Sequence, residues 1–305
     1  MSGWIGGLAE WSEGNTTFLS VAFTWKLDEA YVRAQFAKAF GQRVIAGGPA
    51  LFLVKMQHEL ADVAEYGATY PEVVTKHNPD ATIASRGCPG KGTEDAPDPC
   101  AHCIVPKMWG TKFTLLDKFV VRPILCDDNL SALPSNYQDY IIRRYKESGV
   151  KLRDANSGFE PVTFTEEVYR RWRPLINAGG GPWRFGYDEM SEAKEVRRVL
   201  KMLADEPQKR KRVYVLIGNE PFAECMGRIQ EVIDAGCEPH VQPFMKLTAL
   251  VKRPFVKFDW TEQKLKDVAR WANGWVWKRA PFSEYDRHRK NTAPEQYDQQ
   301  QGLFV

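Results

Sequence analysis

Apolar and polar positions follow two different periods in the first seventy residues. Phe18 to Trp25 is a short apolar run of the strand type, and Asp28 to Phe40 carries apolar residues at helical spacing. Arg43 to Ala46 is a second short strand, directly before Gly47-Gly48-Pro49. A strand, a helix and a strand in this order predict a small β-α-β unit, which we assign to residues 1–78.

The middle of the chain, residues 79–250, repeats a strand followed by a loop and, in most cases, a helix. The predicted strands are Ala81–Ser85, Val121–Cys126, Val150–Arg153, Trp183–Tyr187, Val213–Ile217 and Pro239–Pro243. Helices are predicted near Asn136–Ser148, Thr165–Leu175, Ser191–Ala204 and Phe222–Ala235. This alternation predicts an α/β fold with a parallel sheet. In barrels built this way, chemistry lies at the C-terminal ends of the strands.

Residues 251–305 form a third segment, rich in tryptophan and basic residues. Trp271, Trp275 and Trp277 favour a buried amphipathic element over a base-stacking platform. Candidate contacts to nucleic-acid phosphates in this segment are Lys278, Arg279, Arg287 and Arg289. A solvated basic surface is the alternative reading of these side chains.

Composition favours an ordinary globular enzyme. The chain has 305 residues, of which 43% are hydrophobic, and a formal net charge of +3, so no global charge points to nucleic acid. No apolar run approaches the ~20 residues of a membrane span, and Met1 to Gly14 lacks the pattern of a signal peptide. We therefore expect a cytoplasmic protein without a membrane partner.

Three of the six cysteines lie close together in the sequence. Ser85-Arg86-Gly87-Cys88 is followed by eleven residues and then by Cys100-Ala101-His102-Cys103-Ile104-Val105-Pro106-Lys107. Thiolates are the preferred protein ligands of iron–sulfur clusters, and three of them leave one iron open for an amino-acid chelate such as that of S-adenosylmethionine. A structural zinc site is the alternative, with Cys88, Cys100, Cys103 and either His102 or His77 as ligands.

The phrase Arg86-Gly87-Cys88 and the ending Cys-x2-Cys-Ile-Val-Pro-Lys resemble the radical S-adenosylmethionine superfamily. The usual spacing there is Cys-x3-Cys-x2-Cys, so the residues between Cys88 and Cys100 resemble an inserted loop. The resemblance covers most of Phe18 to Tyr285 and extends to a group with phage-encoded members. The segments that carry it are Cys126 to Leu130, Arg184 to Asp188, Val213 to Gly218 and Pro239 to Phe244.

This resemblance implies a partial (β/α)6 barrel preceded by a small Rossmann-like unit and followed by a helical, aromatic extension. It also implies a [4Fe–4S] cluster on Cys88, Cys100 and Cys103, bound S-adenosylmethionine, and an electron donor of the flavodoxin or ferredoxin type. The Rossmann-like unit is similar to a cobalamin-binding fold, but the chain has no Asp-x-His-x-x-Gly motif. Cobalamin is therefore not predicted.

Several polar residues after the predicted strands are candidates to contact S-adenosylmethionine. Asp127, Asp128 and Asn129 are expected to meet its amino group, although the usual Gly-Gly-Glu of the superfamily is absent. Asp188 or Glu189 is the ribose candidate, with a helix-capping role as the alternative. The remaining candidates are Gly218 for close approach of the cofactor, Asn156 and Gln242 for contact, and His102 for packing near the adenine. Their alternatives are a strand-ending turn for Gly218 and satisfied core amides for Asn156 and Gln242.

Cys126 is the candidate catalytic residue. It ends a predicted strand, where a thiol can donate a hydrogen atom to a substrate radical. A buried, inert thiol is the alternative for Cys126, and the same reading applies to Cys225 and Cys237.

The predicted reaction is reductive cleavage of S-adenosylmethionine to a 5′-deoxyadenosyl radical, which abstracts hydrogen from the substrate. The resembling phage group includes radical isomerases that rearrange amino acids attached to thymidine in viral DNA. An amino-acid-modified thymidine in phage DNA is therefore the leading substrate hypothesis, which places the enzyme in the host cytoplasm. One alternative is radical modification of RNA or of a peptide. The other is a zinc-stabilised nucleic-acid-binding module.

Overall fold

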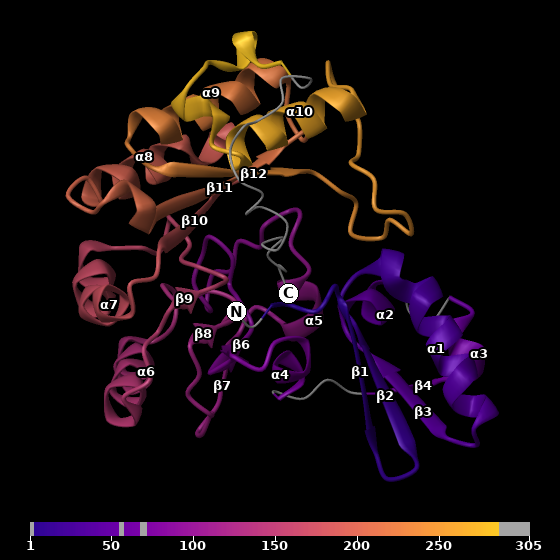
Figure 1. Cartoon of the computed structure of the whole chain (residues 1–305). Helices are drawn as coiled ribbons and strands as arrows, with labels where there is room; N and C mark the ends of the chain where they lie inside the picture. Colours follow the sequence, from indigo (N-terminus) through magenta and orange to yellow (C-terminus); the bar gives the residue numbers. More distant parts are fainter. Residues whose placement is uncertain (1–2, 55–57, 68–71, 287–305) are drawn as a thin grey trace.

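The computed structural model describes residues 3–54, 58–67 and 72–286. In the N-terminal part, β1 (Leu8–Glu13), β2 (Thr16–Val21), β3 (Arg43–Gly47) and β4 (Glu65–Tyr66) form one sheet in that order. β1 pairs antiparallel with β2, and the other neighbours are parallel. α1 (Leu27–Ala39) connects β2 to β3 and packs on the sheet through an apolar core (Figure 1). The predicted β-α-β unit is thus present.

Strand β1 was not predicted. Its residues Ala9 to Ser12 alternate apolar and polar, and Gly14, with φ of 58°, turns the chain into β2. Such a glycine after an alternating segment is a hairpin signal, so the sequence did contain evidence for this strand. Short elements then lead to the middle of the chain: η1 (Thr24–Lys26), which precedes α1, and α2 (Pro49–Val54), α3 (Leu60–Val63) and α4 (Val73–His77).

The middle and C-terminal parts contain parallel strands that are neighbours in chain order. β5 (Ala81–Thr82), β8 (Ile124–Leu125) and β9 (Asp154–Ala155) form one sheet, and β10 (Trp183–Tyr187), β11 (Lys211–Ile217) and β12 (Glu238–Pro243) form another. A parallel bridge between Phe159 and Phe185 joins the segment after β9 to β10. The α/β class is confirmed, and in the described part of the chain these sheets do not close into a barrel.

The first three of these strands are shorter than the sequence predicted. Pro123 has no N–H to offer a neighbouring strand, and pairing in β8 begins directly after it. The backbone N–H groups of Arg153 and Asp154 both donate to the carbonyl oxygen of Pro123, so the strand expected at Val150–Arg153 begins instead at Asp154.

The predicted helices are present as α6 (Ser135–Ser148), α7 (Glu166–Gly179), α8 (Ala193–Met202) and α9 (Phe222–Asp234). The C-terminal extension adds α10 (Glu262–Asn273), whose Trp271 is 2% exposed. Val213, Val215 and Val241 pack with apolar residues of α8, α9 and α10, which lie together on one face of the β10–β12 sheet. The buried amphipathic element expected there is therefore confirmed for α10 and Trp271, whereas Trp277 is half-buried and Trp275, beyond the end of α10, is exposed.

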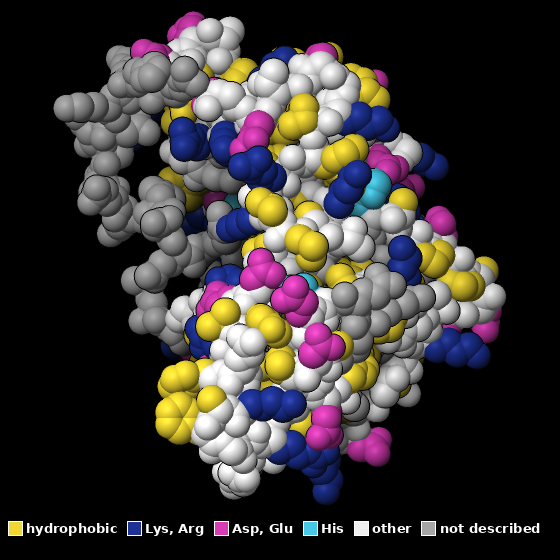
Figure 2. All heavy atoms as spheres, turned by 90° about the vertical axis from the view of Figure 1, so that its right-hand side faces the viewer, with side chains coloured by type: hydrophobic (Ala, Val, Ile, Leu, Met, Phe, Trp, Pro, Cys, Tyr) yellow, Lys and Arg dark blue, Asp and Glu magenta, His cyan; other side chains and the backbone are white. Residues whose placement is uncertain are grey.

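The remaining elements are short. They are β6 (Ser85–Arg86), β7 (Thr114–Leu115), α5 (Val105–Trp109), η2 (Met190–Glu192), η3 (Gln208–Arg210), η4 (Val276–Lys278) and η5 (Phe282–Glu284). None of the helices among the described residues has the length and apolar character needed to cross a membrane. Figure 2 shows acidic and basic side chains interspersed over one face of the molecule.

Candidate functional site

The three clustered cysteines lie on one loop between β6 and α5. Gly87 opens this loop with φ of 95°, and a Cβ there would lie 2.1 Å from the carbonyl oxygen of Lys112, so only glycine fits. The backbone N–H of Cys88 donates to the carbonyl oxygen of Gly110 at 3.3 Å. This bond ties the first cysteine to the residue that follows α5.

The eleven residues between Cys88 and Cys100 fold back on themselves. Gly90 and Asp98 form a β-bridge, and the N–H of Lys91 donates to the Asp98 carbonyl oxygen at 2.9 Å. The N–H of Asp98 donates in turn to the Pro89 carbonyl oxygen at 2.9 Å. The two ends of the insertion therefore lie side by side, which supports its interpretation as an inserted loop.

Nitrogen donors point at two of the cysteine sulfurs. The N–H of Gly90 and the side-chain amide of Asn129 donate to Cys88 Sγ at 3.3 and 3.6 Å. The N–H of Val105 donates to Cys103 Sγ at 3.4 Å. Donors of this kind stabilise negative charge on sulfur, as they do around iron–sulfur clusters.

The cysteines also perturb one another electrostatically. Burial, followed by nearby negative charge that includes the other thiols, raises the pKa of Cys100 to about 12 and that of Cys103 to about 11. Burial likewise raises the pKa of Cys88. Among the described residues no group of three or more His, Cys, Asp or Glu side chains is arranged to hold a metal ion. Three thiols are the number and kind of donor that a [4Fe–4S] cluster needs, and its binding would have to gather the three sulfurs and displace their protons.

Residues of the segment Cys126 to Leu130 support the cysteine loop. Asp127 accepts hydrogen bonds from the Ala84 N–H at 2.9 Å and the Ser85 hydroxyl at 2.5 Å, and burial raises its pKa to about 6. Asp128 accepts from the Gly87 N–H at 2.8 Å and pairs with Arg86 at 3.2 Å. Together with the hydrogen bond from the Asn129 amide to Cys88 Sγ, these contacts of Asp127 and Asp128 hold the start of the loop in place. Direct contact of these residues with S-adenosylmethionine stays a prediction.

Acidic side chains gather where β9 and β10 end. Burial, with a smaller contribution from the charge of the neighbouring Glu192, raises the pKa of both Asp188 and Glu160 to about 7. Lys91 of the inserted loop pairs with Glu192 at 2.7 Å. Glu189 and Glu192 form a capping box at η2, so the capping alternative holds for Glu189.

Sequence reasoning missed Glu160, Glu192 and Lys91 as members of this group. Glu160 comes shortly after a predicted strand, which was an available signal. Lys91 gave no such signal, because only the fold of the insertion brings it to Glu192.

His102 connects the cysteine loop to the ends of β10 and β12. Its Nε2 lies 3.5 Å from Glu189 Oε1, and its ring centroid lies 4.9 Å from that of Phe244. His77, the other candidate fourth ligand of a zinc site, is buried with its Nε2 2.8 Å from the Ser20 hydroxyl. Each of these polar contacts involves Nε2 alone, so it leaves the zinc alternative open.

The other candidate residues occupy different surroundings. A Cβ on Gly218 would meet Leu265 of α10 at 3.0 Å, so this glycine allows close packing of the extension. Gln242 is half-buried on β12. Cys126 is buried and forms a hydrogen bond with Asn156, and burial raises its pKa. Its thiol is therefore protonated at neutral pH, as a hydrogen-atom donor must be, and its catalytic role stays a prediction.

The face of the β10–β12 sheet opposite the helices is polar. The strand register places Arg184, Arg212 and Glu238 in one row and Gly186, Tyr214 and His240 in the next. Burial and the charges of Arg212 and Arg184 lower the pKa of His240 to about 4. Parallel sheets that are covered on both faces are normally apolar on both, so this face is suited to line a site.

The C-terminal bases are only partly available for phosphate. Lys278 Nζ lies 3.6 Å from Glu238 Oε1 and over the rings of Trp275 and Trp277. Arg279 follows directly in the chain, whereas Arg287 and Arg289 lie outside the described residues.

Comparison with protein-family models, with curated proteins and with solved structures finds no match to this chain. The function therefore has to be argued from the site itself.

Shortening the inserted loop tests its independence from the cysteines. Deletion of Gly92 to Asp95 leaves the Lys91–Asp98 and Asp98–Pro89 hydrogen bonds possible, so iron binding is expected to persist. The deletion also removes Glu94, whose Oε1 accepts from the Phe113 N–H at 2.6 Å. A Glu94→Ala variant separates that loss from the shortening. Loss of iron in the deletion but not in Glu94→Ala would contradict the prediction.

Titration of Asp188 predicts a pH-dependent stability. The pKa of an aspartate in the unfolded chain is about 3.9, whereas burial raises the pKa of folded Asp188 to about 7. Between these values the folded state holds the extra proton, so its stability falls as pH rises from about 4 to about 7 and is flat above. Asp188→Asn removes this penalty and is expected to raise stability at pH 8 by on the order of 4 kcal/mol, with no gain below about pH 4. Urea unfolding across this range, with exposed Asp205→Asn as control, measures the difference. A gain independent of pH would count against it.

Proposed function

We propose that this chain is a radical S-adenosylmethionine enzyme. The observation that carries the proposal is the cysteine loop: Cys88, Cys100 and Cys103 share it, and His102 and Lys91 attach it to residues that follow β10 and β12. Strand ends of a parallel α/β sheet are where such folds bind ligands and perform chemistry. When bound, a [4Fe–4S] cluster supplies the electron that cleaves S-adenosylmethionine to methionine and a 5′-deoxyadenosyl radical.

The protein's own residues would hold and orient the cofactor. Asp188 offers a carboxyl group for the ribose hydroxyls of S-adenosylmethionine, and the sulfonium charge of the cofactor would favour the ionised forms of Asp188 and Glu160. Gly186 leaves space beside the Asp188 carboxyl, since a Cβ there would have only Asp188 Oδ1 near it, at 4.0 Å. The polar rows of β10–β12 would then line the substrate side.

The decisive experiment is metal and product analysis of anaerobically purified protein. Iron, sulfide and broad visible absorbance are expected, together with 5′-deoxyadenosine on reduction in the presence of S-adenosylmethionine. Stoichiometric zinc without iron would favour the nucleic-acid-binding module instead.

For the substrate we propose an amino-acid-modified thymidine in DNA, rearranged by an isomerase-type reaction. Mass spectrometry of nucleosides from modified duplex DNA, treated with reduced enzyme and S-adenosylmethionine, would reveal a rearranged product. Turnover only with RNA or with a peptide would assign the enzyme to the alternative substrate classes.

Binding of DNA through the C-terminal bases has its own test. If Lys278 and Arg279 contact phosphates, a double alanine variant should lower the salt slope of log affinity by about one unit per lost contact. Affinity for modified duplex DNA at several salt concentrations measures the slope. Equal slopes for parent and variant would remove these two residues from the DNA interface.

A further inference from the structure

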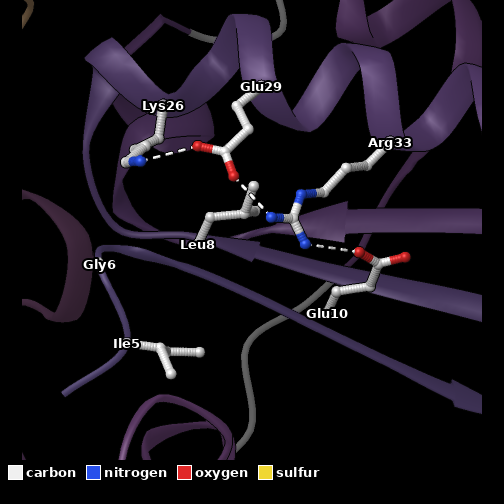
Figure 3. A pocket seen from close by; sticks show the side chains of 7 residues that line it. All are labelled: Ile5, Gly6, Leu8, Glu10, Lys26, Glu29 and Arg33. Carbon is white, nitrogen blue, oxygen red and sulfur yellow. Dashed lines mark hydrogen bonds and ion pairs between the residues drawn. The ribbon is translucent and has the colours of Figure 1, made fainter. Parts of the chain in front are cut away.

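A cleft of about 390 Å³ lies in the N-terminal part, and no residue of the cysteine loop lines it. It opens between the segment that leads into β1 and the start of α1 (Figure 3). Its lining residues are Ile5, Gly6, Leu8, Glu10, Lys26, Glu29 and Arg33. The reaction proposed above uses none of them.

One side of the cleft is a row of alternating charges. Lys26 Nζ lies 2.7 Å from Glu29, Glu29 lies 2.6 Å from Arg33, and Arg33 lies 2.8 Å from Glu10. The helical spacing of Lys26, Glu29 and Arg33 places these three on one face, and Glu10 joins them from β1. The row carries two positive and two negative charges and is neutral as a whole.

The remainder of the cleft is apolar. Leu8 is 7% exposed and lies between the charged row and Ile5, which is 41% exposed. A ligand in this cleft would therefore meet charges along one side and aliphatic carbon along the other.

The row still has unused hydrogen-bonding capacity. The Lys26 ammonium has three protons and Glu29 as its partner, and Glu10 contacts Arg33 through Oε2 only. Arg33 donates through Nη1 to Glu10 and through Nη2 to Glu29, which leaves further N–H groups of its guanidinium beside the free Oε1 of Glu10. These two neighbouring residues can therefore each take a further partner of opposite charge without breaking the existing pairs.

The charge pattern selects among ligand classes. A simple anion would be attracted by Lys26 and Arg33 but repelled by Glu29 and Glu10, and a simple cation would meet the reverse. A dipolar ion carries one positive and one negative charge. If these two charges are as close together as neighbouring charges in the row, the positive group can lie against a glutamate while the negative group lies against the adjacent base. The ammonium nitrogen and nearest carboxylate oxygen of an α-amino acid are about 3 Å apart, similar to the contacts within the row. The termini of a peptide are farther apart and do not match.

We propose that this cleft binds a free α-amino acid with an apolar side chain. Its carboxylate faces Arg33, its ammonium faces Glu10, and its side chain contacts Leu8 and Ile5. The proposal does not depend on the radical chemistry, because the two sites share no residue.

Isothermal titration of the full-length protein with L-leucine tests the proposal. Two probes carry the same aliphatic group with a single charge: 4-methylpentanoate lacks the ammonium, and 3-methylbutylamine lacks the carboxylate. Leucine is expected to bind at least about tenfold more tightly than either, since each lacks one set of charge-assisted hydrogen bonds. Cys88→Ala should bind leucine like the parent, which separates this cleft from the cofactor site.

Arg33→Gln and Glu10→Gln are each expected to weaken leucine binding at least about tenfold. Arg170→Gln is the matched control, because Arg170 also pairs with a glutamate one helical turn away, at the surface of α7. Circular dichroism shows whether each variant is folded. If Arg33→Gln does not fold, Glu10→Gln alone tests the proposal. No heat of binding for leucine, equal binding of the single-charge probes, or unchanged binding in the folded variants would each overturn the proposal.

Discussion

Replacing Cys88, Cys100 or Cys103 by alanine is expected to abolish cluster absorbance and the formation of 5′-deoxyadenosine. Each supplies one of three thiolates on a single loop, and two thiolates cannot hold a cluster that also leaves one iron open. Iron and sulfide content after anaerobic reconstitution, followed by product analysis, measures the effect. We expect loss to background for each single variant.

Cys225→Ala and Cys237→Ala are the controls. Both cysteines are buried in the core between the β10–β12 sheet and its helices, and neither belongs to the cysteine loop. Iron content and product formation should match those of the parent, even if stability falls because of the small cavity left. Normal turnover with a complete cluster in Cys88→Ala would refute the ligand assignment.

Asp128→Ala is expected to destabilise the fold by about 3–5 kcal/mol and to reduce iron binding with it. The carboxylate is buried, pairs with Arg86 and accepts from the Gly87 N–H. Its removal leaves the half-buried Arg86 guanidinium with the Cys126 carbonyl oxygen as an acceptor, and leaves the Gly87 N–H without this acceptor directly before Cys88. Urea unfolding of the protein without iron gives the stability change, and reconstitution gives the iron content.

Asp139→Ala provides the matched control for this loss. Asp139 also pairs with an arginine, Arg171, but its side chain is 62% exposed and Arg171 keeps Glu167 as a partner. We expect a change of less than about 1 kcal/mol and normal iron content. If Asp128→Ala behaved like this control, the Arg86–Asp128 pair would not be what anchors the cysteine loop.

Elements with a strong local pattern could be predicted from the sequence. The helices α1, α6, α8 and α9 and the strands β10, β11 and β12 appear close to their predicted positions, because each has enough residues to display its period. β5, β8 and β9 have two paired residues each, and their bounds depend on what the neighbouring strand and Pro123 allow. Such a boundary has no local signature.

The site divides in the same way. The sequence alone pointed to the cysteines and to the acids directly after predicted strands, Asp127, Asp128, Asp188 and Glu189, because residue type and spacing carry that information. Only the tertiary structure revealed that Asp127, Asp128 and Asn129 hold the start of the cysteine loop, and that Lys91 reaches Glu192. It also decided that Asp188 and Glu160 share a buried environment and that Lys26, Glu29, Arg33 and Glu10 form one row. Burial and partnership arise from residues far apart in the chain, so a reading of local pattern cannot supply them.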